Sequence, residues 1–395
     1  MCSHTSLVYG LITVVDVRKA VGELLPEVAK RADEVEAGRK LTDNLVDDLR
    51  AAGCLRMLVP AEYGGLGLPM PQALRVIEEL ATADGSVAWS VGQVGLSQLI
   101  IGCAQKATVD AVYADGPDVY AAGAVAPKGR ATAIDGGWRI TGQWPFVTGS
   151  QHASWLYLNC LLVSDRAVQV SESGTPLTRI MLLPAAQAQV VDTWHTLGLR
   201  GTGSHDIAVA GATCLAAQGV ELVEGSPETM RAVNSIAQSS LIIASVAVGV
   251  ATGAIDDAVA LAAGGKRPSL SATRLAASAT FQDRLGEAHT VLRAARALLR
   301  DEAEQAWERA SCGNPTSAQD RAQTRAAAAQ VTTLAASVVD TAYGLAGGSA
   351  VYDTSPVQRR MRDVHTATQH FVAGRNSYAT VGALLVGEPV DTGMF

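Results

Sequence analysis

Two stretches of this sequence concentrate the residue types that build ligand sites, Asp135–Trp155 (DGGWRITGQWPFVTGSQHASW) and Trp194–Asp206 (WHTLGLRGTGSHD). Tryptophan, glycine, small hydroxyls and histidine gather there, although aromatic residues make up only 5% of the chain. Aromatic rings supply apolar walls, and a few directed polar groups orient a ligand between them. The two stretches therefore predict a binding site built from strands and turns.

A third stretch, Arg362–His370 (RDVHTATQH), holds two of the seven histidines. Imidazole titrates near neutral pH, so a histidine here is a candidate acid or base. On a continuous helix His365 and His370 would face different sides, because a metal-binding pair needs i, i+4 spacing. The spacing therefore predicts no metal site. Taken alone, His370 would more often be an ordinary histidine on a helix surface.

Length, charge and cysteine usage narrow the class of protein. The 395 residues exceed one ordinary domain, and the net charge of -7 comes without the basic stripe that a nucleic acid would need. The six cysteines are scattered and form no CxxC pair, which argues against disulfides and structural zinc. The apolar run Leu7–Val15 lacks a basic leader, and we expect no window long enough to span a membrane. These features predict a cytoplasmic protein.

The apolar spacing predicts helical domains at both ends and strands between them. Helical spacing runs through residues 1–117, where the nearly all-apolar segment Ser86–Cys103 implies a deeply buried helix. Short β-prone runs fill residues 118–225, with Asp135-Gly136-Gly137 as a hairpin signal. Residues 226–395 are expected to form a four-helix bundle from alanine-rich segments at 230–264, 271–311, 317–346 and 356–387. The predicted fold class is mostly α with a central β domain.

The order of these elements resembles the acyl-CoA dehydrogenase fold. The resemblance rests on the GLGLP loop ending at Pro69, the strand GGWRITGQWPFVTG, and Gly347-Gly348 followed by PVQRRMRDVH. The motifs WPFVTG, HASW and GLRGTGS are more specifically similar to the oxygenase components of two-component flavin monooxygenases, such as hydroxyphenylacetate and secosteroid hydroxylases. This similarity implies an N-terminal helical domain, a small β-barrel or sandwich and a C-terminal four-helix bundle.

The resemblance also implies roles for individual residues. It places His370 over the flavin, to take a proton from a phenol or to steady a flavin hydroperoxide, and Thr148 at the N5 and O2 edge of the ring. The other expected flavin contacts are Trp144, Phe146, Val147, Arg200, Ser204, Arg267, Gln282, Gly347 and Gly348. In related enzymes the phosphate and ribityl contacts often cross a subunit interface. Ser97, Gln98 and His152 are the expected substrate contacts, although phenol hydroxylases carry a histidine where this chain reads Gly95–Gln98.

The activity implied by the resemblance is hydroxylation of a small aromatic or polyketide-like substrate through a C4a-hydroperoxide. The cofactor would be FMN or FAD, supplied in reduced form by a separate NAD(P)H-dependent flavin reductase, with O2 as cosubstrate. No GxGxxG fingerprint follows a predicted strand, which suits a partner that carries out the nicotinamide step. A homotetramer or a dimer is expected. Within this class, N-oxygenation of an amine is the alternative.

Two alternatives belong to other classes. An acyl-CoA dehydrogenase needs a carboxylate to remove the proton beside the thioester carbonyl. By resemblance, Thr354 and Ser239 occupy the places where such enzymes carry that glutamate, so a dehydrogenase would have to use Asp353 or another carboxylate. The third hypothesis is a catalytically silent structural bundle, which failure to bind flavin would favour.

Overall fold

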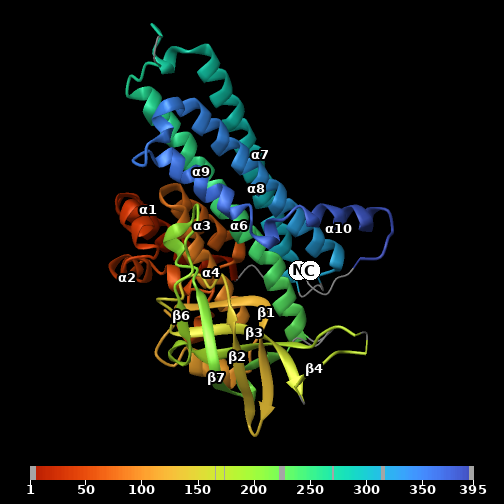
Figure 1. The fold of residues 1–395 in the computed structure, drawn as a ribbon. Helices are drawn as coiled ribbons and strands as arrows, with labels where there is room; N and C mark the ends of the chain where they lie inside the picture. Colours follow the sequence, from red (N-terminus) through yellow and green to blue (C-terminus); the bar gives the residue numbers. More distant parts are fainter. Residues whose placement is uncertain are drawn as a thin grey trace.

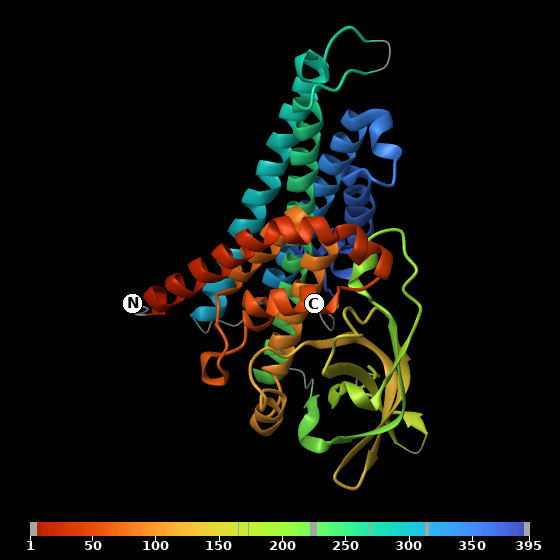
Figure 2. The ribbon, with the colours of Figure 1, turned by 90° about the vertical axis from the view of Figure 1, so that its left-hand side faces the viewer.

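The computed structural model describes residues 6–164, 166–172, 174–221, 227–268, 271–312 and 316–390. Long helices form an upright bundle, and the β-sheet lies at the opposite end of the molecule (Figure 1). Figure 2 shows α1 (Ser6–Gly38) lying across the bundle, above the sheet. The N-terminal helices therefore sit against both the bundle and the sheet.

The N-terminal helices are assembled around a single apolar helix, α4 (Gly85–Ile101), which is buried along nearly its whole length as the sequence predicts. An earlier helix, α2 (Asp43–Ala51), has a clear start and stop. Thr42 Oγ1 accepts a hydrogen bond from the Leu45 N–H at the start of α2, and Gly53 follows its end with φ of 84°. The other elements of this region are η1 (Cys54–Arg56), η2 (Ala61–Tyr63), α3 (Met70–Ala83) and α5 (Lys106–Val112).

The central region is one mixed sheet with the order β6-β7-β2-β1-β3-β5-β8, and β4 pairs with β3. Its strands are β1 (Ala121–Ile134), β2 (Gly137–Trp144), β3 (Trp155–Ser164), β4 (Ala167–Val168), β5 (Thr178–Pro184), β6 (Gln189–Val191), β7 (Asp206–Leu215) and β8 (Gly219–Glu221). Short 3-10 turns follow β5 and β7, η3 (Ala185–Gln187) and η5 (Ala216–Gln218). The predicted hairpin at Asp135-Gly136 is confirmed, because Ile134 pairs with Gly137 across a turn in which Gly136 has φ of 73°.

The C-terminal helices are α6 (Pro227–Ala263), α7 (Ala279–Ser311), α8 (Ala318–Ala346), α9 (Pro356–Ala367) and α10 (Asn376–Leu385). The predicted bounds of two C-terminal helices were wrong. The helix expected from residue 271 starts at Ala279, where Ser278 accepts a hydrogen bond from the Phe281 N–H, and η6 (Leu275–Ala277) precedes it. The helix expected over 356–387 is broken in two, and His370 lies in the break.

The break after α9 has a local cause. The hydroxyls of Thr366 and Thr368 donate to the carbonyl oxygens of Arg362 and His365, at 2.9 and 2.7 Å, in competition with the helical backbone. His370 then caps the short helix η8 (Phe371–Ala373). His370 is therefore a capping residue between two helices rather than a member of a long one.

We expected no window long enough to span a membrane, and by length and composition that expectation was wrong. Ala237–Ala263 in α6 has a mean hydropathy of 1.7 over its most apolar window, which is long enough to span a membrane. In the fold, 78% of that window is buried, because α3, α4 and α8 pack around α6. The apolar character of this helix is explained by its place in the core.

The three regions meet at one turn, Gly198–Thr202, which belongs to the β region and holds η4 (Arg200–Thr202). The Leu199 N–H donates to Asp363 Oδ1 of α9 at 2.6 Å, and Leu199 adopts a left-handed φ of 50°. Gly198 must be a glycine here, since a Cβ would lie 2.1 Å from the Arg362 carbonyl oxygen. A Cβ on Gly201 would equally meet Val35 of α1 at 2.2 Å.

A second carboxylate from the N-terminal helices lies at the same point. Asp84 caps α4 by accepting the Val87 N–H at 2.9 Å, and a Cβ on the neighbouring Gly85 would lie 3.2 Å from Asp363 Oδ2. Both carboxyl groups are buried. Burial, and then the charge of Asp84, raise the pKa of Asp363 to about 7, and burial raises the pKa of Asp84 as well.

Replacement of Asp363 by asparagine should flatten the pH dependence of stability. The folded protein holds a proton on Asp363 that the unfolded chain releases, so wild-type stability should fall as pH rises from about 4 to about 7. Asp363→Asn keeps an acceptor for the Leu199 N–H but cannot ionise. We expect it to recover on the order of 2 kcal/mol at pH 8 relative to pH 5, as measured by urea unfolding at the two values.

Asp363→Ala is the matched control. It leaves the Leu199 N–H without an acceptor and should cost about 1–3 kcal/mol at both pH values. A wild-type pH slope that persists unchanged in Asp363→Asn would show that the buried carboxyl does not titrate in this window.

Candidate functional site

A chain of buried hydroxyls links the two stretches singled out by composition. Thr148 Oγ1 lies 2.8 Å from Ser204 Oγ, which lies 2.7 Å from Thr202 Oγ1. Thr202 Oγ1 donates to the Leu199 carbonyl oxygen at 2.8 Å, and Trp89 Nε1 of α4 donates to Thr148 Oγ1 at 3.2 Å. The structure thus brings Thr148 and Ser204 together and adds Trp89, which the sequence did not single out.

The two ends of this chain set its direction. A carbonyl oxygen can only accept and an indole N–H can only donate, so the hydroxyls donate in the order Thr148, Ser204, Thr202. Each hydroxyl proton is therefore used within the protein. Thr148 Oγ1 accepts from Trp89 and retains a second lone pair. It can serve as an acceptor for one further N–H group.

An exposed aromatic pair lies beside this chain. Phe146 is 71% exposed although it lies next to the buried Val147, and it adopts an unusual positive φ of 63°. Its ring meets that of Trp194 edge to face, with centroids 6.1 Å apart, and Trp194 Nε1 donates to the Leu199 carbonyl oxygen at 3.0 Å. Backbone strain that holds a phenyl ring outward is typical of a ligand-contacting position.

Arg200 supplies a donor that the protein does not use. Its Nε atom is buried and makes no hydrogen bond within the structure. A buried guanidinium N–H without an acceptor is costly, so such an atom indicates a missing ligand oxygen or nitrogen. A flavin fits this set, because its ring needs flat apolar contacts, an acceptor for its N5 hydrogen and donors for its carbonyl oxygens.

His370 reaches the same region through Trp89. The two rings meet edge to face with centroids 5.5 Å apart, and the centroid of the Phe371 ring lies 4.9 Å from that of the imidazole. Burial, helped by the positive charge of Arg325, lowers the pKa of His370 to about 4. The imidazole is therefore neutral at physiological pH.

The hydrogen bonding of His370 also determines which nitrogen carries the proton. Nδ1 accepts the Val372 N–H at 3.4 Å, so the neutral ring holds its hydrogen on Nε2. His370 then offers a hydrogen-bond donor at Nε2. Proton abstraction from a phenol would first require the other tautomer.

Two predicted flavin contacts lie in the core of the β region instead. The Trp144 side chain is fully buried, donates from Nε1 to the Asn159 carbonyl oxygen at 2.7 Å, and fills space left by Gly129 and Gly142. Val147 is fully buried in the same cluster. The side chains of Trp144 and Val147 are therefore enclosed in the core of the β region, although both were expected to contact the flavin.

The predicted substrate contacts are also engaged within the protein. Gln98 Nε2 donates to the Leu55 carbonyl oxygen at 2.6 Å, and its Oε1 accepts the Leu58 N–H at 2.9 Å. Ser97 Oγ donates to the Val94 carbonyl oxygen at 2.6 Å. Both residues are buried, and Gln98 holds the loop after α2 in place. Both polar atoms of the Gln98 amide are therefore used within the protein, and its contact with a substrate stays a prediction.

His152 lies at the junction between the sheet and the N-terminal helices. Its Nε2 is 3.1 Å from the Leu41 carbonyl oxygen, its Nδ1 is 3.6 Å from Asp43 Oδ1, and its ring lies 5.7 Å from that of Tyr120. Burial lowers its pKa. Its ring contacts are with the start of α2 and with Tyr120. Its contact with a substrate stays a prediction.

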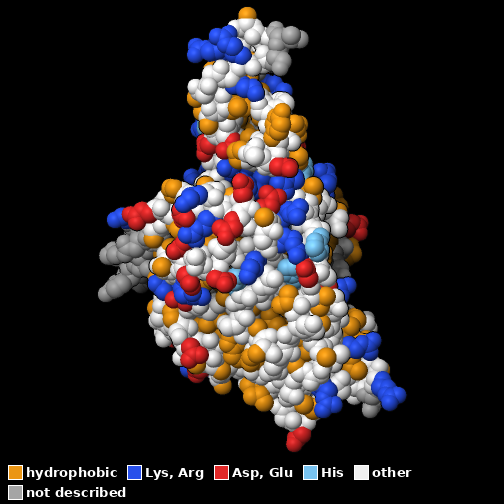
Figure 3. All heavy atoms as spheres, turned by 60° about the vertical axis from the view of Figure 1, so that its left-hand side comes forward, with side chains coloured by type: hydrophobic (Ala, Val, Ile, Leu, Met, Phe, Trp, Pro, Cys, Tyr) orange, Lys and Arg blue, Asp and Glu red, His pale blue; other side chains and the backbone are white. Residues whose placement is uncertain are grey.

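The other predicted cofactor residues gather at the far tip of the bundle. Lys266 donates to Ser349, next to Gly347 and Gly348, and Gly347 has φ of 57°. Arg267 and Gln282 are exposed near the same end and bond only to nearby backbone carbonyls, those of Ala272 and Ala276. Figure 3 shows basic side chains gathered at this tip, with the apolar surface concentrated toward the opposite end. Within one chain, the tip residues do not join Thr148 and His370.

A dehydrogenase base is not found beside His370 among the described residues. Asp353 is exposed in the turn before α9, and the 12 residues of α9 place it about 18 Å from the end that carries His370. Of the buried acidic residues, Glu78 pairs with Arg296, Asp84 caps α4, and Asp363 holds Leu199. In the described chain, no group of three or more His, Cys, Asp or Glu residues could hold a metal ion.

Two positioning residues escaped the sequence analysis, Trp89 and Asp363. Trp89 lies in an almost uniformly apolar helix, so the sequence suggested a core residue and gave no sign that its indole N–H bonds to a site residue. Asp363 lies within the RDVH motif, where its burial could have been suspected from the apolar neighbours Met361 and Val364. Its partner, a backbone N–H from a distant turn, leaves no trace in the sequence.

Comparison with known proteins agrees with this geometry. Residues 15–108 match the family model of the acyl-CoA dehydrogenase N-terminal domain, and residues 241–375 match that of the C-terminal domain. An indole-3-acetate monooxygenase from Pseudomonas putida is 30% identical over 362 residues, which cover 91% of this chain and 90% of that protein.

Two further relatives extend the comparison. The oxygenase subunit HsaA of a flavin-dependent monooxygenase from Rhodococcus jostii is 25% identical and covers 94% of this chain and 98% of its own. The structure of XiaF from Streptomyces sp., solved with FADH2 and glycerol, superposes with a TM-score of 0.88 at 26% identity, covering 96% of each chain. The chain therefore belongs to the acyl-CoA dehydrogenase family, in the branch of the oxygenase components of flavin-dependent monooxygenases.

Proposed function

We propose that this protein is the oxygenase component of a two-component monooxygenase that hydroxylates a small aromatic substrate. It takes reduced FMN or FAD from a separate NAD(P)H-dependent reductase. In the balanced reaction, the substrate, O2 and reduced flavin give the hydroxylated product, water and oxidised flavin. The observation that carries the proposal is Trp89, which joins the Thr148 hydroxyl to the His370 ring at a place where the described residues supply no carboxylate base.

Each residue of the site has a role in this proposal. When bound, the reduced flavin supplies the two electrons that activate O2. Thr148 accepts a hydrogen bond from the ring N–H through its remaining lone pair, and Phe146 packs against the ring. Arg200 donates from its unused Nε to a ring oxygen. Ser204 and Thr202 keep the Thr148 hydroxyl turned away, so that its oxygen faces the cofactor.

His370 acts as the catalytic hydrogen-bond donor. Its neutral ring, with the proton on Nε2, donates to the oxygen atom being transferred and carries no charge that water would have to solvate. Trp89 and Phe371 flank the imidazole and form apolar walls suited to a flat substrate.

Replacement of His370 should uncouple the reaction. With a flavin reductase, NADH, FMN or FAD, O2 and indole as substrate, His370→Ala should lower product formation about 100-fold, the typical effect of removing one donor from a reacting oxygen. Hydrogen peroxide should account for the NADH consumed. His370→Gln, which keeps an N–H donor, is the matched variant and should retain more coupling. Equal product yield from wild type and His370→Ala would remove His370 from the mechanism.

The lowered pKa of His370 predicts a flat acidic limb in the pH profile. A histidine at its ordinary value of 6.5 would lose its neutral form about eightfold between pH 7 and pH 5.5, whereas one with a pKa of about 4 stays neutral. The ratio of wild-type to His370→Gln activity on indole should therefore stay nearly constant over that range. A fall of that ratio toward pH 5.5 would show that the imidazole becomes protonated there.

The hydroxyl chain predicts a specific effect at Thr148. Thr148→Val removes the acceptor for the flavin and leaves the buried Trp89 N–H unsatisfied, which should cost about 1–3 kcal/mol in the free energy of unfolding. Reduced flavin should bind at least about tenfold more weakly, measured by anaerobic titration. Thr148→Ser keeps the hydroxyl and should stay close to wild type. Equal flavin affinity in Thr148→Val and Thr148→Ser would refute the role of the hydroxyl.

We also propose that the protein forms a homotetramer or dimer in which the bundle tip of one chain completes the flavin site of another. The proposal is supported by the exposure of Arg267 and Gln282 far from Thr148. A Thr148→Val chain and an Arg267→Ala chain should each be weak alone. Mixed oligomers should regain flavin binding, because one site in them has both halves intact. Absence of any recovery in verified mixed oligomers would place both halves within one chain.

A further inference from the structure

A buried histidine joins the two stretches of sequence that are rich in tryptophan, glycine and histidine. Only 2% of the His205 side chain is exposed, and its carbonyl oxygen accepts the Val147 N–H at 3.1 Å, next to Phe146. Its imidazole Nδ1 accepts the backbone N–H groups of Thr193 and Trp194, each at 3.2 Å. His205 therefore fixes the backbone that carries both rings of the aromatic pair.

Trp194 belongs to an irregular surface segment, residues 192–198, which contains no helix or strand. Two arginines from neighbouring helices also hold this segment. Arg39, which follows α1, donates to the Trp194 carbonyl oxygen at 3.2 Å, and Arg362 of α9 donates to the Leu197 carbonyl oxygen at 2.9 Å. The 192–198 segment is thus tied to the β region, to α1 and to α9.

Four charged or titratable groups face the His205 imidazole. Asp192 Oδ1 lies 3.3 Å from Nδ1, and Arg39 bonds to Asp192 at 2.6 Å and lowers the pKa of that carboxyl to about 2. The others are His195, within the segment, and Asp206, the next residue in the chain. Burial lowers the pKa of His205 below its usual value, although the charge of Asp192 opposes this effect.

Protonation would reverse the hydrogen bonding of this imidazole. In the neutral ring Nδ1 carries one lone pair, which the Thr193 and Trp194 N–H groups share. A proton on Nδ1 turns the acceptor into a donor, so both of these bonds are lost. The Asp192 carboxylate at 3.3 Å can then accept the new N–H. One proton therefore exchanges the hold on the 192–198 backbone for a side-chain ion pair.

We propose that His205 is a positioning residue for the flavin site, whose neutral imidazole keeps the 192–198 segment closed against Phe146 and whose protonated form releases it. The inference rests on the proposed function and adds regulation by pH to it. With the segment released, Trp194 no longer packs against Phe146, and reduced flavin loses one wall of its site. His205 touches neither flavin nor substrate in this scheme and acts through Trp194.

The first measurement is hydrogen exchange at the Thr193 and Trp194 amides of the flavin-free protein. Acid favours release, because the imidazole of the closed segment binds a proton less readily than that of the released one. Protection of the two amides, corrected for the intrinsic exchange rate, should fall about three- to tenfold from pH 7.5 to pH 5.5. The upper limit is set by an ordinary histidine pKa of about 6.5 in the released segment.

His205→Asn is the informative variant, because its amide oxygen can accept the same N–H groups and cannot be protonated in this range. It should keep its protection at both pH values. His205→Ala removes the acceptor and should lower protection at least about tenfold at pH 7.5. His195→Gln removes the exposed imidazole of the same cluster and should keep the wild-type response to pH.

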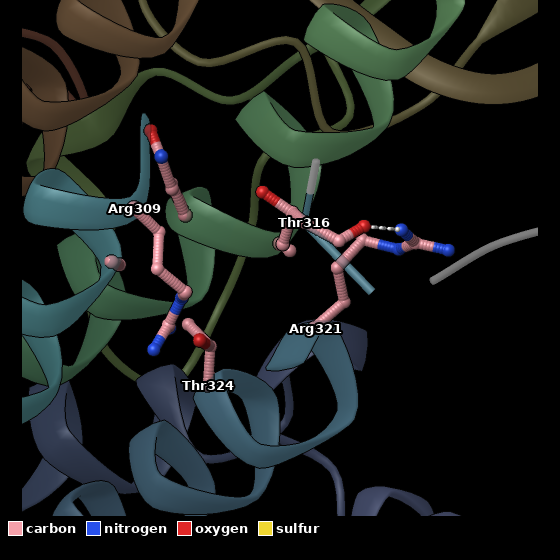
Figure 4. Close-up of a pocket in the computed structure, with 7 residues that line it drawn as sticks. Arg309, Thr316, Arg321 and Thr324 are labelled. Carbon is pink, nitrogen blue, oxygen red and sulfur yellow. Dashed lines mark hydrogen bonds between the residues drawn. The ribbon is translucent and has the colours of Figure 1, made fainter. Parts of the chain in front are cut away.

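Thr324→Val is the control for loss of a buried hydrogen bond elsewhere. Thr324 lines a small hollow between α7 and α8 (Figure 4), where its hydroxyl donates to Glu302 at 2.6 Å. It lies about 24 Å along α8 from Asp340, which contacts His365 of α9. This variant should leave both the protection of the 192–198 segment and its response to pH unchanged.

The second measurement is the affinity for reduced FMN or FAD, by anaerobic titration at both pH values. The ratio of His205→Asn affinity to wild-type affinity should rise at least about threefold from pH 7.5 to pH 5.5. Protonation of the flavin itself is common to both proteins and cancels in this ratio. A ratio that does not change with pH would refute the positioning role.

Two results of the exchange experiment would also overturn the proposal. Wild-type protection at Thr193 and Trp194 that does not fall in acid excludes it even if the variants fail to fold. An equal fall in a folded His205→Asn excludes it as well, because the titrating group then lies elsewhere.

The use of flavin-free protein separates this inference from the proposed function. Acid release that depends on His205 and weakens flavin binding, in a protein that yields no hydroxylated product with reductase and O2, would support the inference and refute the oxygenase. Normal hydroxylation together with acid-insensitive protection would do the reverse.

Discussion

The hydrogen bond from the Leu199 N–H to Asp363 is the contact on which the geometry of the site depends. It holds a residue in a left-handed conformation that costs about 1–2 kcal/mol for any side chain but glycine. It also anchors the turn of the β region on α9, beside the Asp84 cap of α4. The turn carries Arg200, Thr202 and Ser204, so their positions follow from this one anchor. Burial raises the pKa of this carboxyl group to about 7, so it keeps its proton more readily than an exposed aspartate does.

Leu199 also connects the other parts of the site. The Leu199 carbonyl oxygen receives the end of the hydroxyl chain and also the Trp194 N–H, so one residue orients both Thr148 and the aromatic pair of Trp194 and Phe146. Trp89 connects that chain to His370 at the end of α9. The β region, the N-terminal helices and the bundle each contribute one wall. A site at such a junction responds to the relative placement of all three regions.

Comparison with the dehydrogenases of the family explains why this site suits oxygen chemistry rather than desaturation. A dehydrogenase would place a carboxylate where it can remove a proton, but the acids near the junction are committed to structural hydrogen bonds. The described side chains that the junction brings together are neutral or cationic: Thr148, Trp89, a neutral His370, and Arg200. Such an environment stabilises electron-rich oxygen and excludes water, which is the requirement of a monooxygenase.

Much of the fold was determined by the sequence alone. Local rules sufficed for the Thr42 cap, the Asp135-Gly136 hairpin, the buried helix α4 and the three-region order, because each depends on neighbouring residues. The choice of Thr148, Ser204 and His370 as candidates came instead from the resemblance to the flavin monooxygenases. Only the tertiary structure decided that Trp144 is core while Phe146 is exposed, that the Gln98 amide bonds to the backbone, and that Trp89 and Asp363 bond to Thr148 and Leu199. Those assignments depend on hydrogen bonds and burial between segments far apart in the chain, and no local pattern of residue types encodes them.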